Sequence, residues 1–140
     1  MDALYTAEAL STGAGRNGHV RTSDGRLDLD LAMPVELGGT GQGANPELLF
    51  AAGYAACSHN ALLRVARESG VTVSDTAVGA RVGINSKEGG GFTLAVELEA
   101  VIPGLDHDEA QRLADAAHQV CPYSNATRGN IPVTVTVTDA

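Results

Sequence analysis

Two cysteines are the residues of this chain whose chemistry stands out. Cys57 lies in the segment AAGYAACSHNALL, and Cys121 directly precedes a proline in AHQVCPYSNATRGN. Three roles are open to these two thiols: they are buried packing residues, they form half of a metal site, or they are a redox pair. Free cysteine is among the most buried residue types, so packing is the simplest interpretation of both.

A metal site would need the neighbouring histidines as well. His118 and Cys121 are three residues apart on one helix face and could chelate a zinc ion. Cys57 and His59 are two residues apart, and on a helix their side chains would point about 200° away from each other. A Cys/His zinc-binding structural module is therefore an alternative in which one half of the ligand set fits and the other half does not.

A redox role places different demands on the two thiols. An apolar environment raises the pKa of a thiol, so a reactive Cys57 would need a cation beside it. Cys121 could end one helix, which disfavours its thiolate, or begin a new helix at Pro122, which favours it. From the residues alone, packing, metal binding and redox chemistry all stay open.

Composition and charge exclude several classes of protein. The 140 residues suit a single domain, residues 1–140, with one core. A formal net charge of −8 with scattered basic residues argues against nucleic acid and anionic membranes as partners. The first residues lack the pattern of a signal peptide, and no apolar run reaches the roughly 18 residues of a membrane span. We therefore expect a soluble, cytoplasmic protein, in which a disulfide is more often transient than structural.

The cysteines must be positioned by two helices. A long helix is predicted over residues 46–69, with Asn45 as its N-cap, Pro46 in its first position and Glu47 near its positive end. It is apolar or small on nearly every face, which predicts burial on all sides and hence a subunit partner. A second helix is predicted to start at Asp106, where DHDE fits a capping box with Glu109. Its apolar stripe comprises Ala110, Leu113, Ala114, Ala117 and Cys121.

Strands account for most of the remaining chain. Period-two alternation predicts strands over residues 3–10 and 26–37, separated by a turn-rich segment, 13–25, that holds a hairpin with an Asp-Gly turn. Residues 72–85 and 91–103 are predicted to form an antiparallel hairpin, and residues 131–139 a last strand. The glycine-rich segment GGTGQGANPE, residues 38–47, is predicted to be a flexible loop that leads into the long helix and lets it start close to neighbouring backbone. This order of elements indicates an α+β fold with largely antiparallel strands around a long buried helix.

Three segments resemble a known family. HQVCPYSNATRGN, ELGGTGQGANPELLFAAGYAACSHNAL and the early GAGRNG are similar to the organic hydroperoxide resistance (Ohr) proteins of the OsmC/Ohr superfamily, in the same order and over essentially the whole chain. The residues Ser58, His59 and Asn60, which follow the first cysteine, are more polar than this family's pattern. The resemblance implies an intertwined homodimer with two active sites at the subunit interface.

The same resemblance implies a function and a set of residues. The family's activity is a thiol-dependent peroxidase that needs no metal, haem or other cofactor and reduces alkyl or fatty-acid hydroperoxides. Cys57 matches its peroxidatic cysteine, Cys121 its resolving cysteine, Arg16 its catalytic arginine and Glu47 the carboxylate that orients the arginine. The implied reductant is dihydrolipoamide or a lipoylated protein. The alternatives are the zinc-binding module and a non-catalytic protein that binds acyl ligands.

The implied arginine would supply the cation that Cys57 needs. At 4 Å and an effective dielectric of 20, a guanidinium stabilises a thiolate by up to about 4 kcal/mol, which is roughly three pKa units before desolvation takes some back. Glu47 and Cys57 are ten residues apart, about 15 Å along a straight helix. Either a partner subunit that supplies one side of the site or a break in the helix would close this gap.

Overall fold

The computed structural model describes residues 2–138, and these residues form two compact parts that meet in sequence between Leu49 and Phe50. The sequence prediction of a single domain over residues 1–140 stays a prediction. The last residue of the strand predicted over 131–139 lies outside the described residues.

The N-terminal part contains a small antiparallel sheet. Its strands are β1 (Ala9–Thr12), β2 (His19–Thr22) and β3 (Asp28–Asp30), in the order β1-β2-β3. Two short 3₁₀ turns, η1 (Gly15–Asn17) and η2 (Val35–Leu37), interrupt the chain on either side of the β2–β3 hairpin. Gly25 adopts a φ of +75° in the turn between β2 and β3, which confirms the predicted Asp-Gly turn.

Both predicted N-terminal strands are longer than the observed ones. β1 begins at Ala9, directly opposite Thr22 at the end of β2, and beyond this pair only the N–H of Ser23 reaches across, to the carbonyl of Glu8 at 2.9 Å. β3 ends at Asp30 because the chain then turns toward the glycine-rich segment, where Leu31 forms an isolated parallel bridge with Ala44. The prediction of strands over residues 3–10 and 26–37 was therefore right in kind and wrong in extent.

The glycine-rich segment is held by backbone contacts. The N–H of Ala32 donates to the carbonyl of Ala44 at 2.9 Å, and the N–H of Ala44 donates to the carbonyl of Asp30 at 3.0 Å. A Cβ at Gly39 would lie 2.1 Å from the carbonyl oxygen of Met33, so this position admits only glycine. The predicted close approach to neighbouring backbone is confirmed, and the predicted flexibility of the loop stays a prediction.

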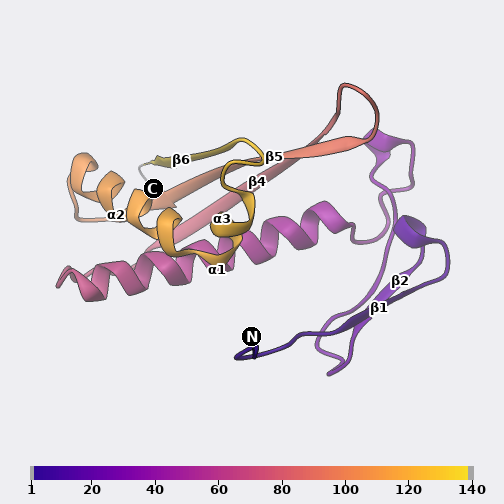
Figure 1. Ribbon diagram of the computed structural model, residues 1–140, viewed down its shortest axis with the longest axis horizontal. Coiled ribbons are helices and arrows are strands. Elements are labelled where there is room, and N and C mark those ends of the chain that lie inside the picture. Colours follow the sequence, from indigo (N-terminus) through magenta and orange to yellow (C-terminus); the bar gives the residue numbers. More distant parts are fainter. Residues whose placement is uncertain (1, 139–140) are drawn as a thin grey trace. The chain divides into compact units, whose positions relative to one another are not determined.

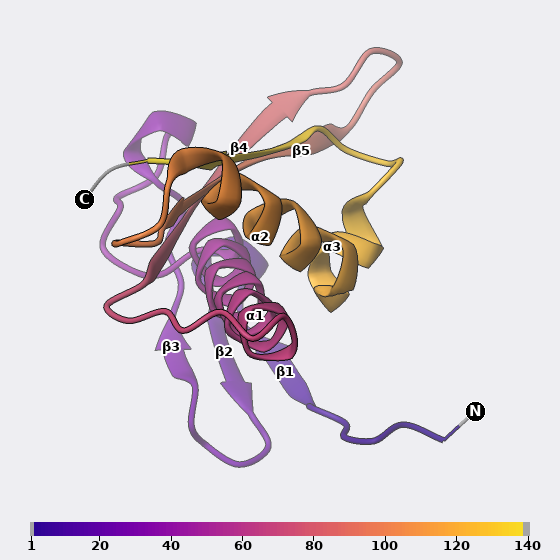
Figure 2. The ribbon, with the colours of Figure 1, turned by 90° about the vertical axis from the view of Figure 1, so that its left-hand side faces the viewer.

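The C-terminal part packs helices against a mixed sheet. The chain enters it on α1 (Pro46–Glu68), and continues through β4 (Ala77–Ser86), β5 (Phe92–Val101), α2 (His107–Val120), α3 (Pro122–Thr127) and β6 (Val133–Val137). The sheet order is β4-β5-β6. Figures 1 and 2 show α1 and α2 on the same side of this sheet.

The pairing within this sheet is antiparallel on one side of β5 and parallel on the other. β4 and β5 form the predicted antiparallel hairpin, and β6 pairs with β5 in parallel. A parallel pair needs a crossover connection, which α2 and α3 provide. The core lies between helices and sheet, and its fully buried members include Tyr54, Leu62 and Leu98.

Both long helices begin where their sequences predict. The N–H of Leu48 donates to the side chain of Asn45 at 2.8 Å, which confirms the N-cap of α1. The N–H of Glu109 donates to the side chain of Asp106 at 2.9 Å, which confirms the N-cap of α2. The predicted apolar stripe of α2 is buried in the core, at Ala110, Leu113, Ala114, Ala117 and Cys121.

One side of α1 is not covered by its own chain. Tyr54, Leu62 and Val65 are buried, but Ala52, Ala56 and Leu63 are exposed on another side of the same helix. The helix is therefore not buried on all sides by its own chain. Among residues 2–138, no helix is both long and apolar enough to cross a membrane.

Candidate active site

The sulfur atoms of the two cysteines are neighbours. Cys57 lies on α1, Cys121 lies between α2 and α3, and their Sγ atoms are 3.1 Å apart. Both are free thiols, and Cys121 is fully buried while Cys57 is partly exposed. A disulfide bond is about 2.05 Å long, so a small shift of either side chain would bring the sulfurs to bonding distance.

The position of Cys121 follows from two helix ends. Its N–H donates to the carbonyl of Ala117 at 3.0 Å and so completes the last turn of α2. Its own carbonyl accepts from the N–H of Asn125 at 2.9 Å and so begins α3, with Pro122 in the first helical position. The two roles that the sequence left as alternatives are both present.

The surroundings of Cys57 oppose its ionisation. Burial raises the pKa of this thiol above its ordinary value, and the neighbouring sulfur of Cys121 raises it further. The backbone N–H of Tyr123 donates a hydrogen bond to Cys57 and lowers the pKa in part. These surroundings agree with the expectation that burial raises the pKa of Cys57, and the need for a nearby cation stays a prediction.

A guanidinium and a carboxylate are paired in the N-terminal part. Arg16 in η1 donates from both terminal nitrogens to the two carboxylate oxygens of Glu47, each at 2.8 Å. The hydrogen bond from Arg16 holds the pKa of Glu47 below its ordinary value, and the same bond raises the pKa of Arg16. Glu47 also lies in the first turn of α1, where the helix dipole favours a negative charge.

The four residues predicted for the site thus form two pairs, Cys57 with Cys121 and Arg16 with Glu47. Each pair lies within one of the two compact parts of the chain. The two parallel hydrogen bonds from Arg16 to Glu47 fix the plane of the guanidinium. The ammonium group of a lysine could not form such a two-point contact.

A buried hydrogen-bonded chain beside Cys121 was not predicted from the sequence. The Nδ1 atom of His118 is 2.7 Å from Oγ of Ser124, which is 2.9 Å from Oη of Tyr54, which is 3.0 Å from Oγ1 of Thr127. Ser124 and Tyr54 are fully buried. One sequence signal for this network is the spacing of three residues from His118 to Cys121, to Ser124 and to Thr127, which spans the end of α2 and the whole of α3.

His118, the histidine of this hydrogen-bonded network, has a pKa below its ordinary value. Burial disfavours the charged form of His118, and the positive charge of Arg128 acts in the same direction, while Asp115 opposes them. These surroundings therefore favour the neutral form of His118. It lies in the last turn of α2, and its Nδ1 is hydrogen-bonded to the hydroxyl of Ser124.

An apolar pocket of about 740 Å³ lies in the C-terminal part. Phe50 and Tyr123 of its lining have ring centres 5.9 Å apart, and the ring of Tyr123 also packs against the buried Tyr54, with centres 5.5 Å apart. Its lining includes the two residues that follow Cys121, and consists of Phe50, Phe92, Thr93, Leu94, Pro122, Tyr123, Ala126, Thr127, Asn130 and Ile131.

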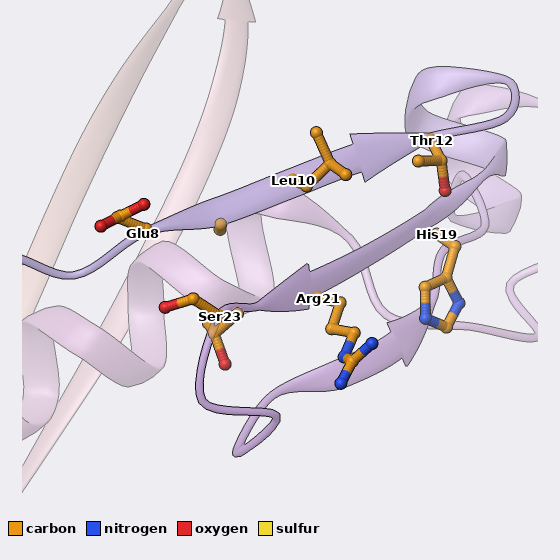
Figure 3. Close-up of a pocket in the computed structure, with 8 residues that line it drawn as sticks. Glu8, Leu10, Thr12, His19, Arg21 and Ser23 are labelled. Atoms are coloured by element: carbon orange, nitrogen blue, oxygen red, sulfur yellow. The ribbon is translucent and has the colours of Figure 1, made fainter.

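A second pocket, of about 560 Å³, lies on the sheet of the N-terminal part (Figure 3). Leu10 and Thr12 of β1 stand directly opposite Arg21 and His19 of β2, on one face of the sheet. Its lining contains no cysteine and neither residue of the Arg16–Glu47 pair. The chemistry of the two thiols is therefore not a property of this pocket.

The zinc alternative lacks a ligand cluster. Within residues 2–138, no three His, Cys, Asp or Glu side chains converge as a metal site requires. Nε2 of His59 is 2.8 Å from Oγ1 of Thr76, and Nδ1 of His118 is bonded to Ser124. The two histidines are thus held by hydroxyl groups.

Comparison with known proteins places this geometry in a family. The family described as OsmC-like protein matches residues 39–136. An organic hydroperoxide resistance protein of Xanthomonas axonopodis pv. citri is 52% identical over 136 residues, which cover 96% of this chain and 94% of that protein.

Solved structures agree in sequence and in fold. An organic hydroperoxide resistance protein from Elizabethkingia anophelis, with thiocyanate bound, is 52% identical, with a TM-score of 0.94 and complete coverage of both chains. A structure from Vibrio cholerae, with captopril bound in one of its active sites, is 52% identical, with a TM-score of 0.91 and coverage of 98% of this chain and 94% of that one. The chain therefore belongs to the OsmC/Ohr family, in its organic hydroperoxide resistance branch.

Proposed function

We propose that the chain is a thiol peroxidase that reduces organic hydroperoxides to alcohols. The observation that carries the proposal is the 3.1 Å separation of the Cys57 and Cys121 sulfurs, with Cys57 partly exposed and Cys121 fully buried. A peroxide from solvent then reaches Cys57 first, and the second thiol already lies beside the atom that is oxidised.

The proposed reaction has two steps in which the protein's sulfurs change. The Cys57 thiolate attacks the terminal oxygen of the peroxide, so that an S–O bond forms, the O–O bond breaks and the alkoxide leaves as the alcohol after taking a proton. Cys121 then attacks the sulfenic acid of Cys57. An S–S bond forms, the S–O bond breaks, and the oxygen leaves as water with the proton of Cys121.

Arg16 is the cation that we propose for the first step. Burial raises the pKa of Cys57, so the thiolate needs a positive charge that its own hydrogen bond from Tyr123 does not supply. The two-point pairing with Glu47 holds the guanidinium of Arg16 in one orientation, which supports a role in positioning charge rather than a free surface side chain.

The organic part of the substrate would lie in the apolar pocket of the C-terminal part. Its lining begins directly after Cys121, at Pro122 and Tyr123, and is rich in aromatic and aliphatic side chains. Alkyl and fatty-acid hydroperoxides should therefore react faster than hydrogen peroxide, which gains nothing from apolar surface. The relative from Vibrio cholerae binds captopril in one of its active sites, which supports a site open to small organic molecules.

The active form that we propose is a homodimer. The exposed side of α1, at Ala52, Ala56 and Leu63, is the side that a second copy would bury. Strand β1 is an open edge of its sheet, and natural proteins rarely leave such an edge uncovered. Because α1 continues without a break over Pro46–Glu68, supply of one side of the site by the partner is the arrangement that we favour for the span between Glu47 and Cys57.

The experiment that tests the function is peroxide consumption with dihydrolipoamide as the reductant. We expect turnover with an alkyl hydroperoxide, much slower turnover with hydrogen peroxide, and none in Cys57→Ser. A lipoylated protein should replace dihydrolipoamide. Turnover in Cys57→Ser that equals that of the unchanged protein would overturn the proposal.

Intact-mass measurement after one equivalent of peroxide follows the sulfurs directly. The unchanged protein should lose two hydrogens as the disulfide forms, whereas Cys121→Ser should add oxygen at Cys57 and over-oxidise. An unchanged mass with two free thiols would exclude a redox pair. A fatty acid that binds in the apolar pocket while peroxide stays unconsumed would instead indicate an acyl-ligand binding protein.

A further inference from the structure

The hydrogen-bonded chain of His118, Ser124, Tyr54 and Thr127 joins the three elements that carry the reactive sulfurs. Tyr54 lies on α1, three residues before Cys57. His118 lies on α2, three residues before Cys121, and Ser124 lies on α3, three residues after it. The oxygen and nitrogen atoms of these side chains therefore bridge the same helices whose junction sets the distance between the two sulfurs.

Burial makes this network of hydrogen-bonded side chains rigid. Tyr54 and Ser124 are fully buried and Thr127 is 5% exposed, and every buried polar side-chain atom among the described residues has a hydrogen-bond partner. A buried polar group that loses its partner is costly, so such a network has one favoured arrangement. Cys121 itself has a second connection to this arrangement, because its backbone completes α2 and starts α3.

We propose that the Tyr54 hydroxyl, through Ser124, is a positioning group that holds Cys121 against Cys57 for the second step of the reaction. The inference rests on the function proposed above, because only that step requires Cys121 to attack the oxidised Cys57. Tyr54 and Ser124 touch neither sulfur through a hydrogen bond, so they act through the placement of α3 and leave the first step, the attack of Cys57 on the peroxide, unaffected.

An aromatic disulfide reagent separates the two steps without any peroxide. With 5,5′-dithiobis(2-nitrobenzoic acid), the partly exposed Cys57 attacks first, forms a mixed disulfide and releases one thionitrobenzoate. Cys121 then attacks the Cys57 sulfur, forms the Cys57–Cys121 disulfide and releases the second thionitrobenzoate. The rate of the first release reports access and ionisation of Cys57, and the rate of the second release reports the placement of Cys121.

The decisive variant is Tyr54→Phe, which removes one oxygen and keeps the ring. Ser124 retains its bond to His118, and Thr127 retains its bond to the carbonyl of Ser124 at 3.3 Å, so no buried partner is orphaned and the fold should survive. We expect the second release to slow about tenfold, which corresponds to about 1.4 kcal/mol, while the first release changes less than twofold. With excess alkyl hydroperoxide, the same variant should accumulate Cys57 sulfinic acid.

Matched variants distinguish positioning from general loosening. Thr76→Val removes a hydroxyl bonded to a different histidine, His59, and should leave both releases unchanged. Thr127→Ser keeps the hydroxyl that faces Tyr54 and should behave as the unchanged protein, whereas Thr127→Val should slow the second release. Equal slowing of both releases in Tyr54→Phe, or no slowing of either, would overturn the inference.

The two proposals can fail separately in this design. A protein that consumes no alkyl hydroperoxide but shows a slowed second release in Tyr54→Phe would refute the peroxidase function and leave the positioning role standing. A protein that consumes peroxide normally in Tyr54→Phe, without sulfinic acid and with an unchanged second release, would refute the positioning role alone.

Discussion

Single side chains set the reactivity of the sulfur pair. Burial and the sulfur of Cys121 raise the pKa of Cys57, and the hydrogen bond from the N–H of Tyr123 lowers it only in part. In these surroundings the thiol is mostly protonated at neutral pH, and only the thiolate attacks a peroxide. The rate of the first step therefore depends on whichever further group favours the charged form.

Substitution of Arg16 tests whether its guanidinium is the group that favours the thiolate of Cys57. Arg16→Ala should raise the pKa of Cys57 and slow the reaction with an alkyl hydroperoxide by orders of magnitude. Arg16→Lys keeps the charge but loses the two-point fork on Glu47, so we expect partial activity. The measurement is thiolate absorbance against pH in a Cys121→Ser background. An unchanged pKa and rate in Arg16→Ala would show that Arg16 has no catalytic role.

The pH dependence of the Arg16–Glu47 pair has a definite sign. The folded-state pKa of Glu47 lies below its ordinary value of 4.5 because Arg16 donates to its carboxylate. The stability that this pair contributes is therefore present above pH 4.5 and is lost as the pH falls through the folded-state pKa. Denaturant unfolding of the unchanged protein and of Glu47→Gln should differ by a constant amount from pH 5 to 8, and by less at pH 3. A difference that persists undiminished at pH 3 would contradict this.

The sequence predicted the two pairs of site residues but not the groups around them. Cys57, Cys121, Arg16 and Glu47 could be chosen because their motifs resemble those of a family. The Tyr54–Ser124 bond joins residues 70 positions apart, and no local pattern indicates such a contact. A buried serine or tyrosine finds its partner only when the helices pack, so the contact of Tyr54 with Ser124 could not be predicted from the sequence.

The contact between α1 and α3 depends on one glycine of the long helix. A Cβ at Gly53 would lie 2.5 Å from Oη of Tyr123 and 3.0 Å from its Cζ. The ring of Tyr123 packs against Phe50 and Tyr54, which limits its movement. Gly53 therefore lets α3 approach α1 closely enough for the N–H of Tyr123 to reach Cys57.

Gly53→Ala should change chemistry more than stability. Alanine is favoured over glycine in a helix by about 1 kcal/mol, which offsets part of the clash with Tyr123. Displacement of Tyr123 would weaken its hydrogen bond to Cys57, so we expect a higher pKa of this thiol, measured by thiolate absorbance. Gly79→Ala in β4 is the control, because its added methyl group meets nothing within 4 Å. A pKa of Cys57 that stays the same in Gly53→Ala would refute this dependence on Gly53.

Helices were easier to predict than strands. Asn45 and Asp106 mark helix starts through bonds to backbone three residues ahead, which is a local signal. The extent of β1 depends on the length of β2, and the direction of β6 depends on the path of α2 and α3. Neither property can be predicted from the residues of the strand itself. The exposed side of α1 shows the same limit, because its apolar pattern indicates burial without saying which chain provides it.

The assembly of two chains can be tested on this side of α1. We expect sedimentation to give twice the mass of one chain, because in the proposed homodimer a second copy would cover Ala52, Ala56 and Leu63. Leu63→Glu should shift the protein toward the mass of a single chain, since a charge at a buried apolar interface is costly. Val120→Glu introduces the same charge at an exposed aliphatic residue of α2 and should leave the mass unchanged. A single-chain mass for the unchanged protein would contradict the homodimer.

The two sulfurs are also far apart along the chain, at positions that differ by 64. A bond between them would close a loop of this length and reduce the conformational entropy of the unfolded chain, which stabilises the folded state by about 4 kcal/mol. The oxidised protein should therefore melt at a higher temperature than the reduced one, and dihydrolipoamide should abolish the difference. In scanning calorimetry, the melting temperature of the protein should therefore rise as alkyl hydroperoxide is added. Each catalytic cycle would then alternate the protein between an oxidised form of higher thermal stability and a reduced form of lower thermal stability.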